Sequence, residues 1–200
     1  IALNIPGKYN IYNYLSAFAL LKEYGIKINK IIEKTKSLKC PPGRMELIKK
    51  NNYFIFVDYA HTPDAIANVL SSIREVLGSR GEIITVVGAG GNRDKGKRPL
   101  MAQESVKGSD RVIITSDNPR FEEPENIIAD MLAGLSDKER ENVLSITDRR
   151  EAIRTACMLA KQNDVILIAG KGHEDYQEIN GVKHHFDDKE VLAEIFDSEK

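Results

Sequence analysis

Two spacings of apolar residues alternate along most of the chain. Helices are predicted where apolar positions recur every three or four residues, at 63–77, 99–107, 124–135, 149–162 and around 191–196. Buried strands are predicted at the short apolar runs 53–57, 82–87, 111–115, 143–146 and 164–169. Because strands that alternate with helices are typical of βαβ units, we expect an α/β, Rossmann-like fold. Its sheet should be mostly parallel, with helices on both faces.

The beginning of the chain has a different pattern. Ile11, Leu15 and Phe18 lie three or four residues apart, which predicts helical structure within residues 8–37. The run Cys40-Pro41-Pro42-Gly43 then ends the helical pattern and is typical of a linker. We therefore expect two parts, residues 1–37 and residues 38–200. In the second part, residues 45–49 should pair with 53–57 as a hairpin across Asn51-Asn52.

Composition excludes several classes of protein. The 200 residues contain 29 basic and 30 acidic side chains, so bulk charge favours neither a nucleic acid nor a membrane as partner. No apolar run approaches the ~18 residues that span a bilayer, and no signal-peptide pattern opens the chain. Cys40 and Cys157 lie far apart without metal-ligand spacing, which favours a reducing, cytoplasmic location and no metal site.

Candidate chemistry follows the predicted strands. In open parallel sheets, ligands bind beyond the carboxyl ends of the strands. Four such ends are followed by glycine, acidic, amide or basic residues, at 58–64, 88–98, 116–120 and 170–175. One polar loop is ordinary in such folds, but four together favour a site for a small polar ligand.

The glycine-rich loop does not fit a dinucleotide site. In Gly88-Ala89-Gly90-Gly91-Asn92-Arg93, an arginine stands where G-x-G-x-x-G requires its third glycine. The loop instead concentrates positive charge, contributed by Arg93, Lys95, Lys97 and Arg98. Such a group favours phosphate or carboxylate, although a solvated run of charges stays an alternative.

Two further loops suit an amino acid. The run Asp117-Asn118-Pro119-Arg120 offers a carboxylate for an ammonium group and a guanidinium for a carboxylate. An ordinary Asx turn with an exposed arginine stays the alternative. Gly170 allows close approach of the backbone, and Glu174 adds a second carboxylate. Asp187-Asp188 is expected to cap the last helix.

These residues resemble the carboxyl-terminal part of the Mur ligase family, the ATP-dependent amino-acid-adding enzymes of peptidoglycan synthesis. The resemblance lies in Gly7-Lys8-Tyr9-Asn10-Ile11-Tyr12-Asn13, Gly43-Arg44-Met45-Glu46, Asp58-Tyr59-Ala60-His61-Thr62-Pro63 and the glycine loop through Lys97-Arg98-Pro99. Within the family, residues 117–120 and 170–174 most resemble the members that add meso-diaminopimelate to UDP-N-acetylmuramoyl-L-alanyl-D-glutamate. The resemblance implies that residues 1–37 are the last helices of a central ATPase domain and 38–200 a carboxyl-terminal domain that closes over ATP.

The resemblance also implies roles for single residues. Asn10 and Asn13 match the asparagines on the adenine side of ATP. Arg44 and Asp58 match nucleotide contacts, with Asp58 on the ribose, and His61 in the same loop is expected to contribute to the nucleotide pocket. The amino-acid pocket is matched by Arg93, Asp117, Asn118, Pro119, Arg120, Gly170 and Glu174. Arg120 resembles the form that selects diaminopimelate over lysine, because the additional carboxylate requires a cation.

In the family, phosphate transfer from ATP activates the carboxylate of the UDP-N-acetylmuramoyl dipeptide, and the amine of the amino acid then displaces the phosphate. The phosphate-binding loop, the Mg²⁺ ligands and the uridine-diphosphate site would lie outside these residues. We therefore expect a piece of a longer enzyme, with no catalytic or metal-binding residue of its own and no ligase turnover. The alternatives are a lysine-adding Mur ligase, a relative of folylpolyglutamate synthase, or a non-catalytic nucleotide- or amino-acid-binding module.

Overall fold

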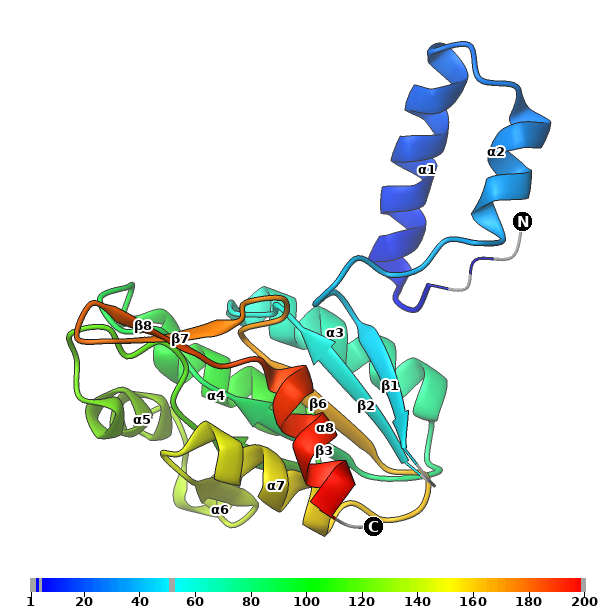
Figure 1. Cartoon of the computed structure of the whole chain (residues 1–200). Helices are drawn as coiled ribbons and strands as arrows, with labels where there is room; N and C mark the ends of the chain where they lie inside the picture. The colour runs from blue at the N-terminus through cyan, green and yellow to red at the C-terminus, as the bar shows by residue number, and fades with distance from the viewer. Residues whose placement is uncertain (1–2, 4, 51–52, 199–200) are drawn as a thin grey trace. The chain divides into compact units, whose positions relative to one another are not determined.

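The computed structural model describes residues 3, 5–50 and 53–198 and divides them into two compact units (Figure 1). The first unit ends at Pro41 and contains helices α1 (Lys8–Glu23) and α2 (Ile28–Thr35). Tyr14 and Thr35 join the two helices through a hydrogen bond of 2.8 Å between their hydroxyl groups. The second unit begins at Pro42 and contains the remaining elements.

A six-stranded sheet forms the centre of the second unit. Its strands are β1 (Glu46–Lys50), β2 (Tyr53–Asp58), β3 (Ile83–Val87), β4 (Arg111–Ile114), β5 (Val143–Ser145) and β6 (Val165–Ala169). They lie in the order β1-β2-β6-β3-β4-β5, and all neighbours are parallel except β1 and β2. The predicted fold class is therefore confirmed. Strands β1 and β2 pair as predicted, whereas Asn51-Asn52 lies outside the described residues.

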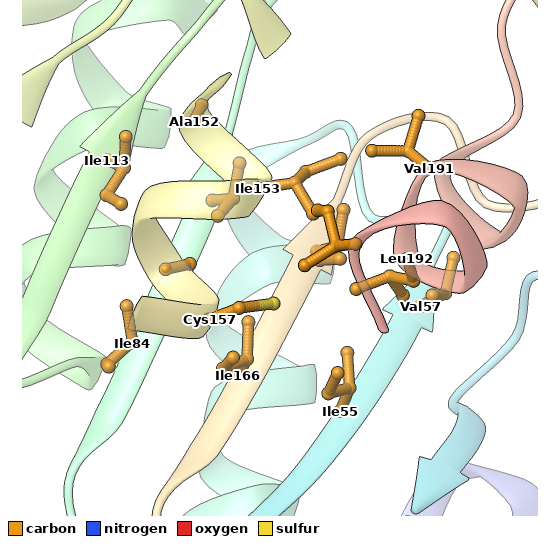
Figure 2. Close-up of a cluster of buried hydrophobic side chains, with 14 residues drawn as sticks. Ile55, Val57, Ile84, Ile113, Ala152, Ile153, Cys157, Ile166, Val191 and Leu192 are labelled. Carbon is orange, nitrogen blue, oxygen red and sulfur yellow. The ribbon is translucent and has the colours of Figure 1, made fainter. Parts of the chain in front are cut away.

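Helices cover both faces of this sheet (Figure 1). Helices α3 (Pro63–Leu77), α4 (Lys97–Gly108) and α5 (Pro124–Leu132) pack side by side on one face. Helices α7 (Arg149–Leu159) and α8 (Asp188–Ser198) lie on the other face, where apolar side chains from both helices meet the sheet (Figure 2). Because both faces are covered, β3 and β6 are buried at every position, which explains their continuous apolar sequences. None of the helices among the described residues combines the length and apolar character needed to cross a bilayer.

Four elements depart from the predicted pattern. The helix expected over 124–135 ends at Leu132, and the short helix α6 (Asp137–Arg140) follows it. Strands β7 (Tyr176–Ile179) and β8 (Val182–His185) form a hairpin that the apolar pattern did not predict. Their sequences, Tyr-Gln-Glu-Ile and Val-Lys-His-His, show little alternation of apolar and polar residues. The hairpin is mostly exposed, so burial imposes little pattern on it.

The strand order determines where a ligand can bind. Strand β6 lies between β2 and β3, although it comes last of the six in sequence. The chain leaves β2 and β3 toward helices on one face, while after β6 it passes through the hairpin to α8 on the other face. The loops that follow these strands therefore separate at the carboxyl edge of the sheet, where open α/β sheets bind their ligands.

Candidate functional site

Four loops at the carboxyl edge of the sheet enclose a cavity of about 460 Å³. They follow β2, β3, β4 and β6, the four strand ends that the sequence indicated. The side chains and backbone that line the cavity come from Tyr59, His61, Gly88, Ala89, Gly90, Arg93, Lys97, Met101, Asp117, Asn118, Arg120, Gly170, Glu174 and Tyr176. The structure thus brings six of the seven residues predicted for the amino-acid pocket to one cavity. The seventh, Pro119, does not line it.

The lining combines charges of both signs. Arg93, Lys97 and Arg120 contribute cations, and Asp117 and Glu174 contribute carboxylates. Arginine binds a carboxylate through two parallel hydrogen bonds, whereas a carboxylate accepts hydrogen bonds from an ammonium group. The cavity can therefore hold a molecule that carries both groups.

Arg120 is held in place by its surroundings. Its Nε lies 3.2 Å from Glu178 Oε2, and its Nη1 donates to the Gly91 carbonyl at 2.8 Å. Its backbone adopts a left-handed φ of 54° and bonds on both sides to the β7–β8 hairpin. Within the described residues, Nη2 has no partner and can donate to a ligand. Glu178 was not predicted from the sequence, because its partner lies in another loop.

Close packing of two loops explains the glycine-rich sequence. The Gly91 N–H donates to the Asn118 carbonyl at 2.9 Å, and a Cβ on Gly91 would lie 1.9 Å from the Pro119 oxygen. Only glycine permits this approach. The loop 88–96 therefore packs against the loop 116–120 that carries Asp117 and Arg120. The need for close packing explains why this loop is rich in glycine although it lacks the dinucleotide-binding sequence.

One predicted member of the cationic group has a different role. Arg98 is fully buried and forms two hydrogen bonds with Glu122, at 2.8 and 2.9 Å, and one with Asp130 at 2.8 Å. Lys95 lies 3.2 Å from the same Glu122 carboxylate. Bonding to Arg98 lowers the pKa of Glu122 to about 2. The expectation that Arg98 attracts a ligand anion was wrong, because its charge is already paired inside the protein.

The predicted nucleotide residues of the second unit lie beside the cavity. Asp58 is buried, and its carboxylate accepts the Met45 and Ala60 N–H groups at 2.7 and 2.8 Å. Burial raises the pKa of Asp58. The Arg44 guanidinium carbon lies 5.0 Å from the centre of the Tyr59 ring. Asp58 thus joins the backbone of the segment that contains Met45 to that of the loop that contains Ala60. The Arg44 side chain is exposed.

Tyr59 connects this group with the cavity. Its ring lies 4.6 Å from the His61 ring and 5.4 Å from the His173 ring, measured between centroids. Its hydroxyl donates to Glu174 Oε1 over 3.5 Å. Burial, followed by the Glu174 charge, raises the pKa of Tyr59, so the hydroxyl stays protonated at neutral pH.

Asn10 and Asn13 belong to α1 in the first unit. They lie three residues apart and therefore share one face of the helix, with Asn13 Nδ2 3.5 Å from Asn10 Oδ1. Asn10 also donates to the Pro6 carbonyl at 2.6 Å. Asn13 is exposed and available to a ligand. Their placement on the adenine side of ATP stays a prediction.

The second unit, which carries these loops, matches a known family. Residues 43–172 match the family model described as Mur ligase, glutamate ligase domain. The chain belongs to the Mur ligase family. Three of the four loops around the cavity lie inside the matched range, and the fourth, 170–175, begins inside it.

Individual Mur ligases are similar over nearly the whole chain. The UDP-N-acetylmuramoyl-L-alanyl-D-glutamate–2,6-diaminopimelate ligase of Phocaeicola vulgatus is 60% identical over 194 residues, which are 96% of this chain and 40% of that protein. The ligase of the same name from Bacteroides fragilis is 59% identical over 197 residues, or 98% of this chain and 41% of that protein. A solved structure of such a ligase gives a TM-score of 0.77 at 40% identity and covers 100% of this chain and 40% of its own. The chain therefore spans about 40% of the length of these Mur ligases.

Proposed function

We propose that the chain is the carboxyl-terminal part of an ATP-dependent ligase that adds meso-diaminopimelate to UDP-N-acetylmuramoyl-L-alanyl-D-glutamate. The observation that carries the proposal is the cavity at the strand ends, because its lining contains both arginines and carboxylates. The similar ligases of P. vulgatus and B. fragilis add support, since their names state this reaction.

The cavity would hold the amino acid. Diaminopimelate carries an ammonium and a carboxylate at each end, so it needs cations and anions in one site. Arg120 would bind one carboxylate through its free Nη2, while Asp117 and Glu174 would accept hydrogen bonds from an ammonium group. Lysine lacks the second carboxylate and would leave Arg120 without a ligand partner. The domain would thus fix the incoming amine for attack on the activated carboxylate, a contribution of several kcal/mol.

ATP would supply the phosphate that activates the dipeptide carboxylate. The exposed donors beside the cavity fit a nucleotide: Arg44 is accessible above Tyr59, and His61 and Lys97 line the cavity wall. Asp58 would act through the backbone that it fixes, or accept a ribose hydroxyl on a remaining lone pair. Among the described residues, no three His, Cys, Asp or Glu side chains gather as ligands of a metal ion. The family resemblance implies that the Mg²⁺ ligands and the site for the UDP-linked substrate would lie in other parts of the enzyme.

Isothermal titration calorimetry with meso-diaminopimelate and L-lysine tests the amino-acid assignment. Arg120→Ala should weaken diaminopimelate binding by about 10- to 100-fold, because a charge-assisted hydrogen bond contributes about 1.5–3 kcal/mol. Arg154→Ala is the matched control, since Arg154 is half-exposed on α7 and, within the described part of the chain, forms its one ion pair with Glu151. Binding of lysine should be the same in all three proteins. No diaminopimelate binding by the wild type, or equal binding by Arg120→Ala, would contradict the proposal.

A further inference from the structure

Lys171 is a fully buried lysine beneath the cavity wall. It follows β6 and lies between Gly170 and Gly172, whose φ angles of 115° and 56° are left-handed. Two glycines in succession around one lysine allow the backbone to turn so that the lysine side chain points inward. A buried ammonium group is tolerated only when it is paired and hydrogen-bonded, so its partners identify its role.

The polar partners of Lys171 are three residues of the candidate site, and its Nζ also lies 5.5 Å from the centre of the Tyr176 ring. Its Nζ lies 3.2 Å from Asn118 Oδ1, 3.7 Å from Asp117 Oδ1 and 3.6 Å from Glu174 Oε2. These acceptors belong to the separate loops that follow β4 and β6. The ammonium group donates one hydrogen bond, to Asn118, and forms ion pairs with the two carboxylates. Lys171 therefore joins both loops at a single point.

Lys171 also determines the orientation of the Asn118 amide. Asn118 Oδ1 accepts from Lys171 and, at 2.9 Å, from the Glu178 N–H, while Asn118 Nδ2 donates to Glu174 Oε2 at 2.9 Å. An inverted amide would place its NH₂ group against two donors and its oxygen against a carboxylate. The donors thus permit one orientation, and that orientation holds the Glu174 carboxylate.

Lys171 further balances charge in the cavity wall. Asp117 and Glu174 are like charges that line one small cavity. No other ion pair of the described residues reaches either carboxylate. The cluster of Lys171, Asp117 and Glu174 therefore has a net charge of −1, which matches the single ammonium at one end of an amino acid.

We propose that Lys171 is the positioning residue of the amino-acid pocket: it holds Asp117, Asn118 and Glu174 in their ligand-binding arrangement without contacting the ligand. This inference rests on the proposed function, because it assumes that these residues bind the ammonium group of an amino acid. Lys171 does not line the cavity itself. Its effect on binding is therefore transmitted through its three partners.

The test compares Lys171→Met with Lys171→Arg in the 200-residue chain. Methionine keeps most of the side-chain volume but removes the charge and the donors, and arginine restores both. Lys107→Met is the control, because Lys107 is exposed on α4 and lies 3.8 Å from Glu104 in a weak ion pair. Titration with meso-diaminopimelate is followed by the amide NMR shifts of residues 116–118, 120 and 170–175.

Lys171→Met should weaken diaminopimelate binding by at least about 10-fold, which is about 1.4 kcal/mol. Lys171→Arg should recover part of this loss, and Lys107→Met should bind as the wild type does. The side-chain amide signals of Asn118 should also move in Lys171→Met before any ligand is added. Equal binding by Lys171→Met, with unchanged Asn118 signals, overturns the inference while the proposed function stands. No binding by the wild type instead refutes the proposed function, and with it the inference.

A measurement on the wild type covers the case in which Lys171→Met does not fold. The Lys171 ammonium should give a ¹⁵N NMR signal whose protons exchange slowly with water, because the group is fully buried, hydrogen-bonded to Asn118 and paired with two carboxylates. That signal should shift when meso-diaminopimelate is added. A signal that exchanges as fast as those of exposed lysines, or that stays unchanged in the ligand-bound protein, overturns the inference.

Discussion

The ion pair between Arg98 and Glu122 gives the most quantitative prediction, for the substitution Glu122→Gln. Glu122 accepts two hydrogen bonds from the buried Arg98 guanidinium and lies between the glycine loop and helix α5. Its pKa is lowered from 4.5 to about 2, chiefly by Arg98 and then by the Asn92 N–H. The folded state therefore stabilises the ionised form of Glu122 relative to the unfolded state.

This difference sets the magnitude of the effect. A pKa lowered by about 2.5 corresponds to at most about 3.4 kcal/mol, since each unit equals about 1.36 kcal/mol. Glu122 is partly exposed to water, which reduces this value, and Asp130 still pairs with Arg98 in the variant. We therefore expect Glu122→Gln to lower the free energy of unfolding by about 2–3 kcal/mol at neutral pH, somewhat less than a fully buried pair would lose.

The dependence on pH has a defined sign. Because the folded pKa is the lower one, the contribution of Glu122 is complete above pH 4.5 and is lost as the pH falls toward 2. The wild type and Glu122→Gln should therefore converge in stability as the solution becomes acidic. Urea unfolding, followed by circular dichroism between about pH 7 and about pH 3, measures this.

Glu104→Gln is the matched control. Glu104 lies on α4 and pairs over 3.8 Å with the exposed Lys107, so its loss should cost less than about 1 kcal/mol at any pH. The reasoning is refuted if Glu122→Gln changes the stability at neutral pH no more than Glu104→Gln does. It is equally refuted if the difference from the wild type stays constant as the pH falls.

Two further substitutions test the structural support of the cavity. Asp188→Asn should destabilise the second unit by about 3–5 kcal/mol in urea unfolding, because it leaves the fully buried Arg149 without its ionised partner; a cost below about 1 kcal/mol would contradict this. Gly172→Ala should lower the melting temperature by several degrees, since φ is 56° and the new Cβ would lie 2.8 Å from the Gly43 carbonyl oxygen. Gly25→Ala, with a similar positive φ but open space around the Cβ, should lower it less, and an equal effect would show that packing against Gly43 is unimportant.

The position of the candidate site was predictable from the sequence because it follows from topology. Asp117 and Glu174 are 57 residues apart, yet each follows a strand of one parallel sheet, and those strands flank β3. Parallel strands end at a common edge, so residues just beyond them meet whatever their separation in the chain. The apolar pattern was sufficient to predict those strands.

The partners of the charged residues were not predictable in this way. Asp187 and Asp188 were both expected to cap α8. Asp187 accepts the backbone N–H of Lys189 in the first turn of the helix, whereas Asp188 forms a buried ion pair with Arg149. Glu178 lies in a hairpin that the apolar pattern did not indicate. A charge is assigned to the surface by default, because its burial depends on a partner that only the folded chain provides. For the buried Lys171, the flanking Gly170 and Gly172 are a local feature of the sequence that indicates an unusual backbone path.

These internal partners bear on how the cavity would bind a ligand. Arg120 pairs with Glu178, and Lys171 pairs with both Asp117 and Glu174. The charged groups of Arg120, Asp117 and Glu174 therefore keep their positions without a ligand. Arg93 differs: it is exposed, and no hydrogen bond or ion pair holds it among the described residues. Ordering one long side chain costs about 0.5–1.5 kcal/mol, whereas groups that are already fixed add little to that cost. Among the charged residues, Arg93 should therefore lose the most conformational entropy on binding. Removal of the Arg93 side chain should reduce the affinity for diaminopimelate less than removal of the Arg120 side chain does.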